Sequence, residues 1–194
     1  GFSREAQDAF AIASTTRAKQ ANEDRSFDWE MAPVTLAAKQ GSAAKAAGAG
    51  DTVVRFDEQP FKAKLDKIPS LKPAFKKDGT ITAANASSIS DGAAALLLMR
   101  ESTAAQRGLQ PLARIVSHAV HAQAPEWFAT APAGAINKAL KKAGWDARQV
   151  ELWEVNEAFA AVTMAAMSEF KLPHDIVNVH GGACALGHPI GASG

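Results

Sequence analysis

A chain of 194 residues can bury a substantial core, and its 47% hydrophobic and 21% charged residues exclude disordered and collagen-like proteins. The 21 basic and 20 acidic residues give a formal net charge of +1, so no overall field attracts nucleic acid or a membrane surface. Cys184 is the single cysteine, which prevents an internal disulfide, and no apolar run approaches the ~20 residues of a membrane span. We therefore expect a cytoplasmic protein without nucleic-acid or membrane partners.

Both ends of the sequence resemble interior positions of a longer chain. Residues 1–5 contain neither an initiator methionine nor the basic-then-apolar order of a secretion signal. The other end, at Gly194, follows a run of glycines where a helix is expected to begin. The sequence therefore predicts an incomplete chain.

The first half of the chain predicts one long helix followed by irregular segments and a buried strand. Apolar residues at helical spacing predict a helix over residues 3–20. Residues 27–34 are expected to be extended, and the Ala-, Gly- and Lys-rich stretch 37–50 to form an exposed loop. Residues 93–99 are apolar without alternation, which favours a strand buried on both faces, although periodicity alone does not exclude a helix.

The second half alternates helices and strands. Helices are expected over residues 101–107, 132–143 and 156–170, and strands over residues 111–120, 150–155 and 176–179. This alternation predicts the α/β fold class, with parallel strands in the sheet.

Lysines are concentrated in the segment before Gly79. They are Lys62, Lys64, Lys67, Lys72, Lys76 and Lys77. A solvated face is one interpretation. The other is a seat for the phosphates of a nucleotide-like ligand, because a lysine ammonium offers a point charge to such groups.

Residues 178–194 contain five glycines and a proline, which predict a tight loop that brings backbone close to a ligand. A phosphate-binding loop requires Lys and then Ser or Thr where His188 and Pro189 stand. A metal site of His180, Cys184 and His188 requires a helix to bring these residues to one face, and the glycines and Pro189 oppose one. The remaining interpretation is that His188 handles protons or binds a developing oxyanion.

Asn156 directly follows a predicted strand, at the edge of an α/β sheet where ligands bind. A structural role is the alternative, because Asn is a preferred N-cap of the helix expected to begin there. Both Asn156 and His188 follow candidate strands, so we expect their side chains to meet in one cleft.

Four groups of residues resemble the signature motifs of the thiolase family, in family order along essentially the whole chain. They are residues 156–159 (Asn-Glu-Ala-Phe), 181–183 with 187–194 (including Gly-His-Pro), 71–75 with 79–87 and 91–93, and 3–8. The resemblance implies a layered αβαβα core with a loop (cap) domain, only partly present. Residues 1–89 then belong to the loop domain, 90–110 end the first core half, and 111–194 begin the second.

The resemblance also implies site residues and an activity. His188 and Asn156 would hold an oxyanion-hole water that faces the thioester oxygen of an acyl-CoA. The residues lining the coenzyme A channel would be Phe75, Ala83, Ser87, Ala158 and Phe159. The implied reaction joins two acetyl-CoA molecules into acetoacetyl-CoA and CoA, or the reverse, in fatty acid metabolism, by a homotetramer or dimer. CoA and acyl-CoA are substrates, and no permanent cofactor or metal is expected.

The sequence departs from the family at several positions. Ala84 replaces a usual glycine, and Pro60 and Phe61 lie where an arginine near the adenine is expected, so nearby lysines are candidates to compensate. The acylated cysteine and the second, proton-transferring cysteine of thiolases lie in regions that this sequence does not contain. Cys184 is a candidate substitute, but a lone Cys between two alanines is more typical of a small buried hydrophobe.

Two rival functions remain at this point. An inactive thiolase piece would keep CoA-binding or oligomer surfaces without chemistry. A β-ketoacyl synthase-like enzyme would instead condense acyl groups held on a carrier protein.

Overall fold

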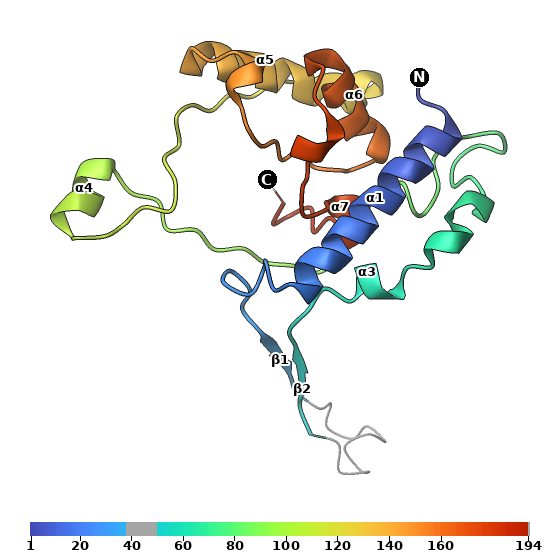
Figure 1. Cartoon of the computed structure of the whole chain (residues 1–194), viewed down its shortest axis with the longest axis horizontal. Coiled ribbons are helices and arrows are strands. Elements are labelled where there is room, and N and C mark those ends of the chain that lie inside the picture. Colours follow the sequence, from blue (N-terminus) through green and yellow to red (C-terminus); the bar gives the residue numbers. More distant parts are fainter. Residues whose placement is uncertain (38–49, 194) are drawn as a thin grey trace.

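The computed structural model describes residues 1–37 and 50–193. In chain order the elements are α1 (Arg4–Glu23), β1 (Val34–Leu36), β2 (Thr52–Val54), α3 (Gln59–Lys62), η1 (Leu65–Ser70), α4 (Glu101–Gln106), η2 (Pro125–Thr130), α5 (Ala131–Ala143), η3 (Ala147–Gln149), α6 (Ala160–Phe170), η4 (His174–Ile176) and α7 (Ala183–Leu186). Helices α5 and α6 lie on one side of α1 and α7, the β1–β2 hairpin projects away on the other, and α4 stands apart (Figure 1).

Helix α1 confirms the helix predicted near the N-terminus. Ser3 precedes it in an extended conformation and accepts a hydrogen bond from Ala6 N at 3.2 Å, which satisfies one free donor of the first turn. The buried face is unusually polar and includes Gln7, Asp8, Ser14, Thr15 and Asn22. The helix therefore meets the rest of the molecule through hydrogen bonds as well as apolar contact.

A buried asparagine fastens the segment before α4 to this helix. Asn85 is 0% exposed, and its side chain donates to Asp8 Oδ1 at 3.0 Å and accepts from Thr82 N at 2.8 Å. Asp8 also pairs with Arg4, at 2.6 Å. The backbone of Asn85 accepts from Ala160 N at 2.8 Å, so this one residue joins α1 to the start of α6.

The region predicted to be extended contains a turn over residues 27–30 and then β1. Strand β1 pairs antiparallel with β2, with Val34 opposite Val54. The exposed loop expected between them falls, for residues 38–49, outside the described residues.

Helix α4 is present as predicted, but the strands expected on either side of it are wrong. Residues 93–99 and 111–120 run extended and join no sheet in the described part of the chain (Figure 1). Leu96 is 86% exposed and Leu112 is 87% exposed. An apolar strand is buried only where neighbours cover both of its faces, and no described element covers residues 93–99 in this way.

The segments predicted as strands over residues 150–155 and 176–179 lie parallel to each other, although the ladder between them is short. Trp153 and Val177 form an isolated parallel bridge. The side chain of Asn178 extends the pairing, because it accepts from Val155 N and donates to Val155 O, both at 2.8 Å. Asn178 itself has a positive φ of 47°, so the ladder ends there.

The helices predicted over residues 132–143 and 156–170 are α5 and α6, the second of which begins at Ala160 instead of Asn156, and they enclose an apolar cluster. Trp153, Leu172 and Val177 form its buried centre, and Trp153 stacks on Phe170 with ring centroids 5.9 Å apart. Helix α5 ends at Gly144, which takes the left-handed conformation expected of a glycine C-cap. No helix in the described part of the chain is long and apolar enough to span a bilayer.

The glycine-rich loop contains a short helix, α7, that the sequence did not predict. Gly181, just before it, has a φ of +79°, and a Cβ there would lie 2.4 Å from Ser14 O. A side chain is therefore excluded by both backbone conformation and space. The glycine lets the loop press directly against α1.

Candidate functional site

Asn156 and His188, although 32 residues apart in sequence, meet in space. Asn156 Nδ2 lies 3.3 Å from His188 Nε2, which is the proximity that the sequence predicted. Asn156 is exposed and His188 is half-buried, so a ligand has access to the pair. An amide donor beside an imidazole can bind one water or one oxygen between them.

The structure also removes the N-cap interpretation of Asn156. Helix α6 begins at Ala160, and Phe159 occupies its N-cap position without a side-chain cap. Asn156 lies before this boundary, at the end of an extended segment. The side chain is therefore available for a ligand rather than for the helix.

His188 is held by backbone and by the serines before α4. Its N–H donates to Ser88 O at 2.8 Å, and Ser88 Oγ donates to Gln59 Oε1 at 2.6 Å. Gly187 has a φ of +90°, and a Cβ there would lie 2.1 Å from Ser90 Oγ. His188 Nδ1 is buried and has no hydrogen-bond partner among the described residues. Ser88, Ser90 and Gln59 were not predicted, because no motif in the sequence identifies them as neighbours of His188.

Three aromatic rings pack together around Phe159, three residues after Asn156 in the sequence. Phe159 makes an edge contact with Phe75, with ring centroids 6.4 Å apart. Phe128, which was not predicted, makes a similar contact with Phe159 at 6.3 Å. Ser87 donates twice to Ala158 O, from N at 3.1 Å and from Oγ at 2.9 Å. The structure thus brings together four of the residues expected to line a channel.

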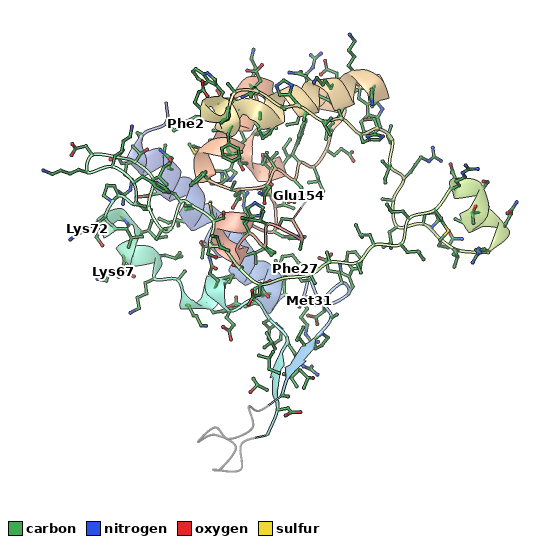
Figure 2. All side chains as sticks on the ribbon, turned by 180° about the vertical axis from the view of Figure 1, so that it is seen from behind. Phe2, Phe27, Met31, Lys67, Lys72 and Glu154 are labelled. Carbon is green, nitrogen blue, oxygen red and sulfur yellow. The ribbon has the colours of Figure 1, made fainter. Side chains whose placement is uncertain are left out.

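Ala83, the fifth residue expected to line the channel, lies in a hollow of about 390 Å³. Lys62, Lys64 and Lys67 line the same hollow. Lys62 pairs with Glu58 and Lys67 with Asp66, whereas Lys64 makes no ion pair within residues 1–37 and 50–193. Lys67 and Lys72 lie along one edge of the molecule (Figure 2). These lysines give the hollow a positive rim that suits an anionic ligand.

Cys184 is buried in the fold. It is 5% exposed, and its Sγ lies 3.7 Å from Glu157 O. Burial raises the pKa of the Cys184 thiol, and the Glu157 carboxylate raises it further. A thiol in this environment stays protonated and is a poor nucleophile.

The metal alternative has no geometric support. His180, one of its three proposed ligands, packs edge-on against Phe27, with centroids 5.7 Å apart. Among the described residues, no group of three His, Cys, Asp or Glu side chains could hold a metal ion.

We expect native Cys184 to react with iodoacetamide at least ~100-fold more slowly than the same residue in denatured chain, because the thiolate is the reacting form. The measurement is the rate of mass increase at pH 8. Cys184→Ala is the blank, since the chain contains a single cysteine. Fast labelling of the folded chain would contradict the buried assignment.

Comparison with known proteins is consistent with this geometry. The model for the thiolase N-terminal domain matches residues 1–102, and the model for the thiolase C-terminal domain matches residues 109–194. The crystal structure of the Bacillus anthracis acetyl-CoA acetyltransferase superposes with a TM-score of 0.90 at 42% identity, covering 98% of this chain and 46% of that one. The Ascaris suum Acat5 thiolase, in complex with coenzyme A, gives a TM-score of 0.83 at 37% identity, covering 100% of this chain and 47% of that one. The α/β fold class is confirmed.

Curated relatives agree. A probable acetyl-CoA acetyltransferase of Dictyostelium discoideum is 49% identical over 193 residues, which is 100% of this chain and 45% of that protein. The acetyl-CoA acetyltransferase of Paracoccus denitrificans is 47% identical, over 100% of this chain and 47% of that protein. The chain belongs to the thiolase family. It spans about half the length of the curated relatives it matches.

Proposed function

We propose that this chain supplies the oxyanion-hole side of a thiolase active site, for CoA-dependent acyl transfer that makes or cleaves 3-oxoacyl-CoA such as acetoacetyl-CoA. The contact of Asn156 Nδ2 with His188 Nε2, at 3.3 Å, is the observation that carries the proposal. In the reaction, loss of a proton from the acyl-CoA leaves an enolate with its charge concentrated on the thioester oxygen. A water held by Asn156 and His188 faces that oxygen, and preorganised donors of this kind are worth ~3 kcal/mol.

Acetoacetyl-CoA cleavage by a form of the protein extended to the length of its relatives tests this proposal. The acyl group is expected to pass through a cysteine in the added sequence, so acyl-enzyme should be trapped there and not on Cys184. A folded, extended form without turnover would contradict the proposed function.

The same proposal places coenzyme A against the hollow and the aromatic rings around Phe159. The channel is formed by Phe75, Ala83, Ser87, Ala158 and Phe159. Apolar walls suit the pantetheine arm, and lysines at the rim suit the phosphates. Lys64 is best placed to compensate for the missing arginine, because it lines the hollow and makes no ion pair in the described part of the chain.

We expect Lys64→Glu with Lys67→Glu to weaken CoA binding by ~10-fold, because each substitution reverses a charge beside the ligand phosphates. Calorimetric titration of the chain with CoA measures the effect, and added salt should reduce the difference. Lys141→Glu, on the exposed surface of α5, is the matched control and should leave Kd unchanged. Equal weakening by both variants would contradict a local role for Lys64 and Lys67.

Further parts of the proposal concern the whole protein. We assign residues 1–89 to the loop domain, 90–110 to the end of the first core half and 111–194 to the start of the second. We further propose that the whole protein forms a homotetramer or dimer, lies in the cytoplasm and acts in fatty acid metabolism. The β-ketoacyl synthase alternative is set aside, because both family models that match the chain are thiolase models.

A second candidate function is binding without chemistry. It is favoured by one observation, namely that Cys184, the single cysteine, is buried. On this view the chain by itself binds CoA or a partner chain and turns over nothing.

A further inference from the structure

Glu157 is a fully buried acid next to Asn156. It is 0% exposed, and its carboxylate accepts hydrogen bonds from three separate parts of the fold. Ser14 Oγ on α1 donates at 2.7 Å, Asn178 Nδ2 at 2.9 Å and the backbone N–H of Cys184 on α7 at 3.1 Å. The Glu157 carboxylate therefore connects, through hydrogen bonds, the segment that contains Asn156 and the loop that leads to His188.

The chemistry around the Glu157 carboxylate is unusual. A buried carboxylate is costly unless it is paired or fully hydrogen-bonded. Every donor to Glu157 that the structure gives is neutral, and no Lys, Arg or His of the described residues forms an ion pair with it. The acid is thus held by the geometry of its donors alone, and its position is sensitive to theirs.

The loop before His188 is built tightly around this carboxylate. Gly182 N donates to Ser14 Oγ at 3.0 Å, and Ser14 in turn donates to Glu157. A Cβ on Gly182 would lie 2.4 Å from the Glu157 carboxyl carbon. The acid and the loop therefore move together.

This arrangement bears on the pair of site residues. Asn156 and His188 stand on different segments, and their mutual contact at 3.3 Å is exposed. A contact of this kind does not hold two segments in place by itself. Glu157 accepts a hydrogen bond from Cys184 and is linked through Ser14 to Gly182. These bonds hold the start of α7, the short helix that precedes His188.

We propose that Glu157 is a positioning residue for the oxyanion hole: its carboxylate sets the distance between Asn156 and His188 by tying both segments to α1. This inference rests on the proposed function. The residue touches no substrate. Its role is to keep the Asn156 and His188 side chains at a separation that one water can bridge. At such a site, a displacement of about 1 Å has a large kinetic effect.

Glu157→Gln tests the inference, because the amide keeps the size of the side chain but turns one acceptor into a donor that opposes the Cys184 N–H or the Asn178 side-chain NH2. In a form extended to the length of its relatives, we expect kcat to fall by ~10- to 100-fold while KM changes by less than about twofold, since only transition-state stabilisation is lost. Ser14→Ala should give a smaller fall of the same kind. Glu151→Gln, an exposed acid on the same segment, should leave both constants unchanged.

A second readout does not depend on turnover. In the chain itself, NMR shifts of the Asn156 side-chain amide and the His188 ring should move in Glu157→Gln and Ser14→Ala but not in Glu151→Gln. If Glu157→Gln does not fold, Ser14→Ala still decides the question. Unmoved shifts with normal kcat in the folded variants would overturn the positioning role. Absence of turnover in the unsubstituted extended form would instead contradict the proposed function, and the NMR comparison alone would then decide the role of Glu157.

Discussion

Replacing His188 by alanine is expected to lower kcat by ~10²- to 10³-fold in a form extended to the length of the relatives, because the substitution removes one of the two proposed oxyanion donors. The Kd for CoA should change by less than about threefold, since the lost donor acts chiefly in the transition state. Steady-state cleavage of acetoacetyl-CoA and a parallel CoA titration measure the two quantities. Asn156→Ala should produce a loss of the same kind.

His180→Ala is the matched control, because His180 stands in the same loop but packs against Phe27 instead of facing Asn156. It should leave kcat within about twofold of the unsubstituted protein. Comparable losses in kcat and CoA affinity for His188→Ala would indicate a structural role and contradict the oxyanion assignment.

The chain alone is expected to show no thiolase turnover above background, even though it presents Asn156 and His188 together. Acyl transfer through an enzyme thioester requires a reactive thiolate, and positioned donors do not replace one. Burial raises the pKa of the Cys184 thiol, which keeps the thiol in its protonated, poorly nucleophilic form. Acetoacetyl-CoA cleavage, assayed on protein whose mass matches these residues, measures the result.

Two controls make this result informative. Adding the remaining sequence of a relative in trans should produce activity, which would place the nucleophile outside residues 1–194. Turnover by the chain alone that disappears in Cys184→Ala would show instead that Cys184 is the nucleophile.

The helices of this protein are largely predictable from local sequence. Ser3 and the apolar spacing after it predict α1, and Gly144 marks the end of α5, because caps and periodicity act within a few residues. Strand formation depends on distant partners. Residues 93–99 have the apolar composition of a buried strand, yet they lie exposed because no described strand pairs with them.

The candidate site shows the same division. Its motifs at residues 156–159 and 187–194 are short local patterns, so the sequence predicts His188 and Asn156 as a pair. It does not show that α6 begins at Ala160, which frees Asn156 from capping, nor that α7 forms within a glycine-rich loop. Both depend on residues far away in the sequence, since Ala160 N donates to Asn85 O and Gly181 lies against Ser14 O of α1.

The sequence by itself determined the family, the α/β class, most helices and the two short motifs that carry Asn156 and His188, because each of these follows from residues close together in the chain. Only the tertiary structure decided that Cys184 is buried beside Glu157 and that the buried Glu157 carboxylate joins three parts of the fold. Ser14, which donates to Glu157, lies 143 residues away in the sequence. Burial and hydrogen bonding of this kind are properties of residues that meet only after folding, so they are absent from any local reading of the chain.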